Sequence, residues 1–124
     1  MSGFVFHATI NPFAGVDLDQ CRNPETGIIE EWALKIVRYL NSYTEISPSG
    51  TGLHLFVVGS LPDDAKQGKV YKVELYDRER YFTVSGNHVA GTPTTDEERS
   101  FQLKDLHAKC WSGDLVTVMK VFGF

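Results

Sequence analysis

The chain has 124 residues, enough for one domain with a modest hydrophobic core, and it carries a net charge of −4. This acidic balance argues against broad, non-specific phosphate binding, because that needs a basic surface, but it does not exclude a local basic groove. No apolar run approaches the roughly 18 residues of a membrane helix, and the first residues lack a secretory signal. Cys21 and Cys110 have no metal-type spacing, so we expect reduced thiols in a cytosol.

Two strands are predicted at the start of the chain, separated by a turn signal. Phe4–Ile10 alternates apolar and polar residues, and Gly15–Asp19 does the same. We expect these strands to pair as a hairpin. In the second strand, Asp17 and Asp19 project together from the face opposite the core, because alternate side chains of a strand point to opposite sides.

Two carboxylates this close repel each other and destabilise the fold unless something neutralises them. A hard divalent cation such as Mg²⁺ is a common partner for such a pair. An acidic turn at the end of a strand is equally compatible with this stretch, because Asp is common where chains turn. The residues alone leave both interpretations open.

The middle of the chain predicts a helix over Ile29–Asn41 with one apolar face, then strands over Tyr43–Ile46 and Leu53–Val58. Between the strands lies a turn rich in hydroxyl groups and glycine, formed by Ser47, Pro48, Ser49, Gly50, Thr51 and Gly52. Such a turn can offer free N–H and hydroxyl donors to a ligand. His54 follows at the start of the next strand, beside whatever the turn holds. The alternative is an ordinary hairpin turn.

Two further strands are predicted over Val70–Tyr76 and Arg80–Ser85. Glu74 stands between two apolar neighbours, as Asp17 does. A third carboxylate on the same small sheet is what a metal site needs, although an exposed Glu is also common on strands.

The last part of the chain begins with a capping box formed by Thr95 and Glu98, which predicts a helix from Thr95 to about Cys110. We therefore expect one domain over residues 1–111. Residues 112–124 form an unassigned tail with a weak strand at Leu115–Val121.

Three motifs resemble, in this order, those of archaeo-eukaryotic-type primases. They are Val16-Asp17-Leu18-Asp19, Gly52-Leu53-His54 and Val73-Glu74-Leu75. The surrounding residues are similar to those of phage and plasmid primase-polymerases, over the stretches Gly15–Gly27, Ser47–His54, Glu74–Asp77 and Arg80–Gly86. The resemblance covers about residues 3–106. Each motif alone is weak, and their common order and spacing make the set specific.

The resemblance implies an α+β fold, with an RRM-like, mainly antiparallel sheet and two helices packed on one face. It implies template-directed nucleotidyl transfer from nucleoside triphosphates, with Asp17, Asp19, Glu74 and His54 as catalytic residues. The three carboxylates would bind two Mg²⁺ or Mn²⁺ ions. The residues implied for the nucleotide are Ser47, Ser49, Gly50, Thr51, Gly52, His54 and Arg80.

The implied partners are a single-stranded DNA template, nucleoside triphosphates and a helicase domain or protein, with no membrane. The implied setting is the cytoplasm of a bacterial or archaeal host, with the protein encoded by a phage or plasmid. Relatives usually carry a further α/β module before the first motif, on which this chain almost begins. We therefore expect a core without that module: a minimal active core, an excised piece, or a remnant that binds without polymerising.

Two non-catalytic alternatives remain. One is an RRM-like module that binds nucleotides or single strands, for which Tyr71, Tyr76, Tyr81 and Phe82 could stack on bases, although aromatic residues of strands more often belong to the core. The other is a regulatory protein that uses the apolar tail Leu115–Phe124 for protein contacts and forms a stable dimer.

Overall fold

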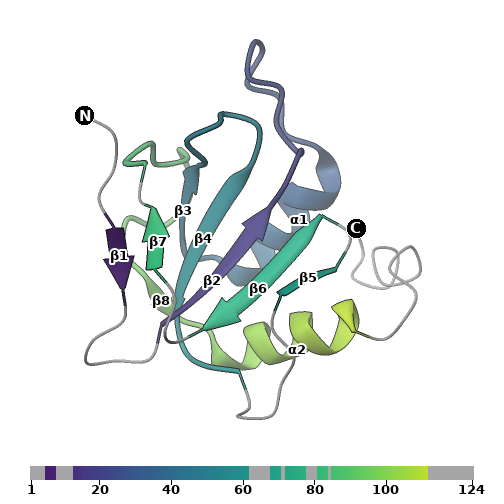
Figure 1. The fold of residues 1–124 in the computed structure, drawn as a ribbon, viewed down its shortest axis with the longest axis vertical. Coiled ribbons are helices and arrows are strands. Elements are labelled where there is room, and N and C mark those ends of the chain that lie inside the picture. The colour runs from purple at the N-terminus through teal and green to yellow at the C-terminus, as the bar shows by residue number, and fades with distance from the viewer. Residues whose placement is uncertain are drawn as a thin grey trace.

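The computed structural model describes residues 5–7, 13–61, 68–70, 72–77, 81–83 and 85–111. The centre of the fold is a mainly antiparallel sheet with the strand order β3-β4-β2-β6-β5 (Figure 1). Its strands are β2 (Phe13–Leu18), β3 (Tyr43–Ile46), β4 (Leu53–Val58), β5 (Gly68–Val70) and β6 (Val73–Asp77). A short strand, β8 (Glu97–Glu98), runs parallel to the end of β4. β1 (Val5–His7) and β7 (Tyr81–Thr83) form a separate two-stranded sheet.

Two helices cover one face of the central sheet, α1 (Glu31–Leu40) and α2 (Ser100–Cys110). Figure 1 shows α1 behind the strands and α2 beneath them. Their buried residues join those of the strands in one hydrophobic core, which includes Val16, Leu18, Ile36, Leu40, Leu55, Leu75, Leu103 and Leu106. The predicted α+β architecture, with an antiparallel sheet and both helices on one face, is confirmed. In the described part of the chain, no helix is long and apolar enough to cross a membrane.

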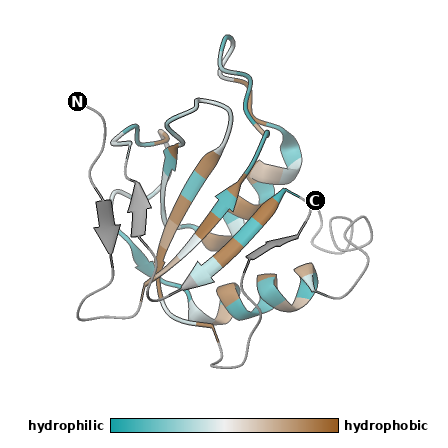
Figure 2. Cartoon of the chain, viewed as in Figure 1, coloured by the Kyte–Doolittle hydropathy of each residue, from teal (hydrophilic) through white to brown (hydrophobic). Residues whose placement is uncertain are grey.

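The alternation of residues along β2, β4 and β6 separates two faces of the sheet. Figure 2 shows it as brown and teal bands that follow one another along these strands. Val16, Leu55 and Leu75 have no exposed surface and lie on the side of the helices. The residues between them project to the other side, which therefore carries the polar groups of the three strands.

The predicted hairpin of the first two strands is wrong. β1 pairs with β7, where Phe6 lies opposite Phe82. β2 lies between β4 and β6 and is hydrogen-bonded to both. A strand in the middle of a sheet has both of its edges occupied, and partners that lie far along the chain cannot be read from local alternation. The strand predicted over Val70–Tyr76 is likewise two strands, β5 and β6, joined by a tight turn at which Val70 pairs with Val73.

The predicted capping box is also wrong, because α2 begins at Ser100. Glu97 and Glu98 belong to β8, and the Glu97 N–H donates to the Ser42 hydroxyl at 2.8 Å. The hydroxyl of Thr95 donates to the Glu97 carboxylate, while Glu98 Oε2 accepts from the Ser100 N–H at 3.1 Å. Pairing with β4 thus outweighs the local preference for a helix start. The tail of residues 112–124, with its predicted strand at Leu115–Val121, lies outside the described residues.

Candidate functional site

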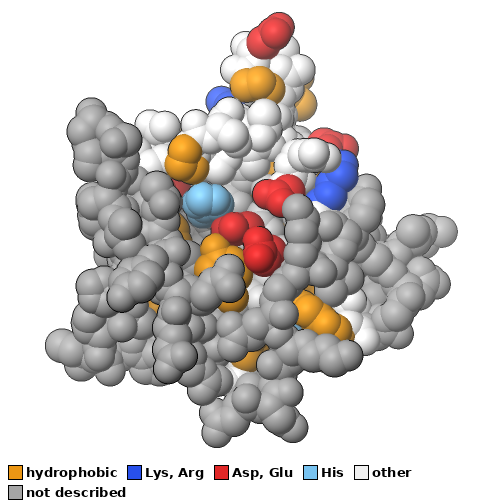
Figure 3. All heavy atoms as spheres, viewed as in Figure 1, with side chains coloured by type: hydrophobic (Ala, Val, Ile, Leu, Met, Phe, Trp, Pro, Cys, Tyr) orange, Lys and Arg blue, Asp and Glu red, His pale blue; other side chains and the backbone are white. Residues whose placement is uncertain are grey.

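A row of polar residues crosses the face of the sheet opposite the helices. Glu45 of β3 lies opposite His54 of β4, His54 opposite Asp17 of β2, and Asp17 opposite Glu74 of β6. Directly opposed residues on neighbouring strands share a face of the sheet. Figure 3 shows acidic side chains gathered beside a histidine over the middle of the strands. The structure thus brings Asp17, His54 and Glu74 together, as the sequence motifs predict.

Asp17 is the centre of this row. Its Oδ1 lies 3.6 Å from His54 Nε2, and its Oδ2 accepts a hydrogen bond from the Tyr76 hydroxyl at 3.0 Å. Burial raises the pKa of Asp17, and the charges of Glu74 and Asp19 raise it further, while His54 and the Tyr76 hydroxyl act in the opposite direction. Ionisation of Asp17 is therefore less favourable here than in water, and a bound cation would relieve that cost.

A second row, largely aromatic, runs beside the polar one on the same face. It places Tyr43 opposite Phe56, Phe56 opposite Gly15, and Gly15 opposite Tyr76. Phe56 and Tyr76 are buried, and Tyr43 packs against them. The prediction of Tyr76 as an exposed base-stacking residue is therefore wrong, because its ring is covered and its hydroxyl is bonded to Asp17.

Asp19 follows directly after β2, and its backbone N–H donates to the Lys72 carbonyl at 2.8 Å. The predicted nucleotide turn packs against this strand end. A Cβ atom on Gly52 would lie 2.6 Å from the Leu18 carbonyl oxygen and 3.6 Å from the Asp19 Cα. Only glycine allows this approach without moving the backbone, so Gly52 sets the position of the turn beside Asp19.

The turn of residues 47–52 satisfies most of its own donors. The N–H groups of Gly50 and Gly52 donate to the carbonyl and the hydroxyl of Ser47 at 2.9 and 3.1 Å. The Ser47 and Ser49 hydroxyls lie 3.0 Å apart, and those of Ser49 and Thr51 lie 2.8 Å apart. The expectation of free N–H donors is therefore wrong for Gly50 and Gly52. What the turn presents is a chain of three hydroxyl groups.

Arg22 is a residue of this region that the motifs did not single out. Its Nη1 donates to the Gly50 carbonyl at 2.8 Å, and the N–H groups of Cys21 and Arg22 both donate to the Thr51 carbonyl. These bonds fasten the turn to the segment that leaves β2. The segment rises beyond the sheet at the top of Figure 1. Arg22 therefore places a cation beside the hydroxyl turn.

Asp17, Asp19 and Glu74 supply hard oxygen donors, and their mutual repulsion fits a divalent cation in chemical terms. Within the described residues, however, no group of three or more His, Cys, Asp or Glu side chains is arranged to hold a metal ion. The predicted metal site stays a prediction. Arg80, predicted to contact the nucleotide, lies outside the described residues.

Two other residues belong to the site in roles that the sequence analysis did not give them, Tyr76 and Glu45. Tyr76 lies two positions after Glu74 on β6, so the strand period alone places it on the same face. Glu45 lies on β3, two residues before the turn of residues 47–52, but the groups that bond its carboxylate lie much later in the chain. The signal for Tyr76 was therefore present in the sequence, and that for Glu45 was not.

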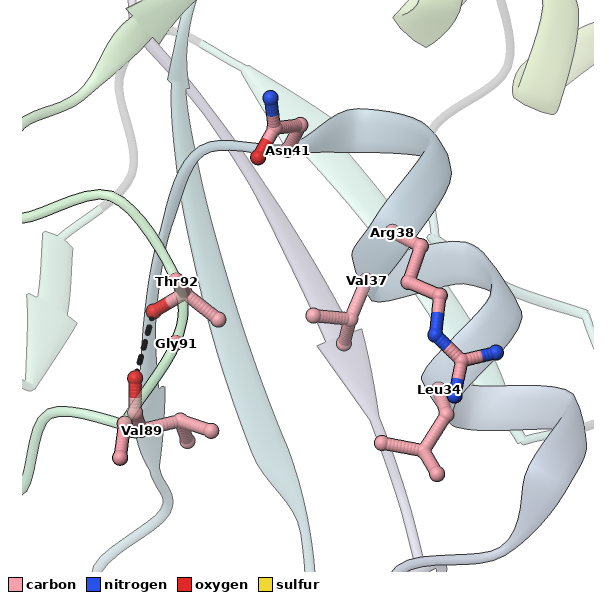
Figure 4. A pocket seen from close by; sticks show the side chains of 8 residues that line it. Leu34, Val37, Arg38, Asn41, Val89, Gly91 and Thr92 are labelled. Carbon is pink, nitrogen blue, oxygen red and sulfur yellow. Dashed lines mark hydrogen bonds between the residues drawn. The ribbon is translucent and has the colours of Figure 1, made fainter.

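A pocket of about 200 Å³ lies away from the polar row. Leu34, Val37 and Arg38 of α1 line one side, and Val89 and Thr92 of a later loop line the other (Figure 4). The Thr92 hydroxyl donates to the Val89 carbonyl at 2.8 Å, and Arg38 pairs with Glu31 at 3.2 Å. The pocket contains none of the predicted site residues, and we assign it no function.

No protein-family model matches the chain. It is similar to a phage primase-polymerase. Over 88 residues, 68% of this chain, it is 40% identical to the DNA primase-polymerase of Nitratiruptor phage NrS-1. The chain spans 12% of the length of that relative. The similarity supports the predicted relation to phage primase-polymerases, for the part of the relative that is matched.

Proposed function

We propose that this chain carries a metal-dependent nucleotidyl-transfer site of the DNA primase-polymerase type. The observation that supports it most directly is the register of His54, Asp17 and Glu74 on three neighbouring strands, with Asp19 beside the hydroxyl turn. The similarity to a phage protein named as a DNA primase-polymerase points in the same direction.

In this proposal the turn of residues 47–52 binds the triphosphate of the incoming nucleotide through its hydroxyls, and the His54 imidazole donates to the same anion. Asp17, Asp19 and Glu74 would hold the divalent cations, which when bound neutralise the triphosphate and polarise the attacking 3′-oxygen. The chain itself positions these groups and holds their charges in place before the nucleotide binds. Tyr76 orients Asp17, and Arg22 fastens the turn.

The proposed partners follow from this chemistry. A polymerising site needs a single-stranded DNA template and nucleoside triphosphates, and a helicase domain or protein would supply unwound DNA. Because the net charge is −4, template binding would depend on a local groove and not on the overall field of the protein.

Calorimetric titration of dATP and ATP, with Mg²⁺ or Mn²⁺, tests the proposal. The variant is the double substitution Asp17→Ala/Asp19→Ala, and Glu25→Ala/Glu31→Ala is the control, because it removes two exposed acids outside the row. We expect metal-dependent binding to the wild type and the control. In the Asp17/Asp19 variant it should weaken by more than about 100-fold, since loss of outer-shell partners alone costs 10–100-fold. Absence of binding to the wild type would contradict the proposal.

A second candidate is a module that binds nucleotides or single strands without catalysis. One observation favours it: the two oxygens of Asp17 already face His54 and Tyr76. This candidate predicts binding of single-stranded DNA that needs no Mg²⁺ and survives Asp17→Ala/Asp19→Ala. Primer extension by the wild type would decide against it.

A further inference from the structure

Glu45 is a buried carboxylate of which, among the described residues, only one oxygen accepts hydrogen bonds. Its side chain has no exposed surface. Oε2 accepts hydrogen bonds from the Ser85 hydroxyl at 2.8 Å and from the Gly86 N–H at 2.7 Å. No hydrogen-bond donor among the described residues approaches Oε1. A buried acceptor without a partner destabilises a fold, so its presence calls for a reason other than stability.

The place of Glu45 in the sheet suggests that reason. It lies between two histidines in register, His54 on β4 and His88 on the segment beyond β3. The His88 Nε2 lies within 3.0 Å of the carbonyl oxygens of Thr92 and Pro93, and the His88 ring stacks on Tyr43. The His88 imidazole is therefore already hydrogen-bonded within its own loop. His54 is the neighbour that belongs to the candidate site.

His54 thus has a carboxylate on each side along the row. Asp17 on β2 lies 3.6 Å from its Nε2, and Glu45 on β3 lies directly opposite it in the pairing register. Cβ atoms of such opposed pairs are about 4.5–5.5 Å apart, within reach of side chains of this length. The hydrogen bonds from Ser85 and Gly86 engage one oxygen of Glu45. The other oxygen therefore stays available to the neighbouring residues of the row.

We propose that Glu45 is a positioning residue for His54, whose carboxylate attracts the imidazole from the β3 side while Asp17 lies against it on the β2 side. The ring would then meet the triphosphate in a single orientation. This inference rests on the proposed function, since it assigns the orientation of a residue in that same site. It gives a role to the member of the row that comes from β3, the strand that leads into the hydroxyl turn.

The test is a double-mutant cycle. Glu45→Gln keeps the size of the side chain and an oxygen that can accept the hydrogen bonds from Ser85 and Gly86. His54→Ala removes the group through which Glu45 would act. Binding of dATP with Mg²⁺ is measured by calorimetry. We expect Glu45→Gln to weaken binding by about tenfold, as loss of outer-shell partners does. In the His54→Ala background the same change should weaken it by less than about twofold.

Asp96→Asn is the matched control, because Asp96 lies close enough to Glu45 for their charges to interact but is not in the row. It should leave the affinity for dATP unchanged. Thermal unfolding separates positioning from structural support: Glu45→Gln should unfold at the wild-type temperature or above it. A lower melting temperature with unchanged affinity, or equal losses of affinity in both backgrounds, would overturn the proposal.

A second measurement does not depend on nucleotide binding. Long-range ¹H–¹⁵N spectra at one fixed pH report the tautomer and mobility of each imidazole, and His54→Ala assigns the His54 signals. We expect Glu45→Gln to change the His54 signals and to leave those of His107, on α2, unchanged. Unchanged His54 signals, or a change confined to His88, would overturn the proposal. If the wild type binds no dATP but the His54 signals respond, only the proposed function fails.

Discussion

The two faces of strands β2, β4 and β6 differ in the side chains that they carry: one face is apolar and the other carries charged groups. On the helix side, Val16 and Leu55 have no exposed surface and lie in one apolar core. On the other side, their neighbours Asp17 and His54 face each other, and the raised pKa of Asp17 reflects burial and nearby like charge. The helix face is arranged for stability, whereas the polar face keeps an arrangement that costs stability. Such a cost is typical of functional sites.

The largest expected effect comes from a substitution on the helix face. Leu55→Ala removes a fully buried side chain and leaves a cavity, so it should lower the free energy of unfolding by about 2–5 kcal/mol in urea denaturation. Its neighbour on the polar face is the comparison: His54→Ala should weaken dATP binding and change the stability much less. If Leu55→Ala weakened dATP binding by the folded protein as strongly as His54→Ala does, stability and nucleotide binding would not be divided between the two faces.

A smaller change in stability is expected at Asp96, which directly precedes β8. Burial, together with the charges of Glu45 and Glu97, raises the pKa of Asp96 from 3.8 to about 6. Because the folded protein holds this proton more tightly, ionisation of Asp96 destabilises the fold as the pH rises from about 4 to about 6. Asp96→Asn removes that cost. It should stabilise the protein by about 1–2 kcal/mol at pH 8, allowing for partial exposure.

Thermal unfolding of the wild type and Asp96→Asn between pH 4 and pH 8 measures this difference. The two proteins should have nearly equal stability at pH 4, and the gap should open by pH 6 and then stay constant. A gap that is as large at pH 4 as at pH 8 would show that charge is not its cause.

The two faces also differ in how far the sequence predicts them. Alternation places Asp17, His54 and Glu74 opposite the core on their separate strands, and it needs only local information. Which strands become neighbours depends on contacts distant in the chain, so the partner of β2 was predicted wrongly. Glu45 shows the same limit, because Ser85 and Gly86, which bond its carboxylate, lie about 40 residues further along the chain. The capping box at Thr95 failed because β8 pairs with β4, a contact that no local pattern contains.

The smallest expected change in stability accompanies a specific loss of function on the polar face. Tyr76→Phe removes the hydroxyl that donates to Asp17 Oδ2 at 3.0 Å and keeps the buried ring. We expect the free energy of unfolding to fall by about 1 kcal/mol or less, the net value of one hydrogen bond. Metal-dependent dATP binding should weaken by about tenfold, because the carboxylate loses the group that orients it.

Tyr39→Phe is the matched control for this last substitution. The Tyr39 hydroxyl donates to Asp105 Oδ2 at 2.6 Å, a bond of the same kind between α1 and α2, away from the polar row. Both variants lose one tyrosine–carboxylate hydrogen bond, so denaturation should change by similar amounts. Only Tyr76→Phe should change the affinity for dATP in calorimetry. Equal affinities for the two variants would mean that the Tyr76 hydroxyl stabilises the fold alone, and Asp17 would then need no orienting partner.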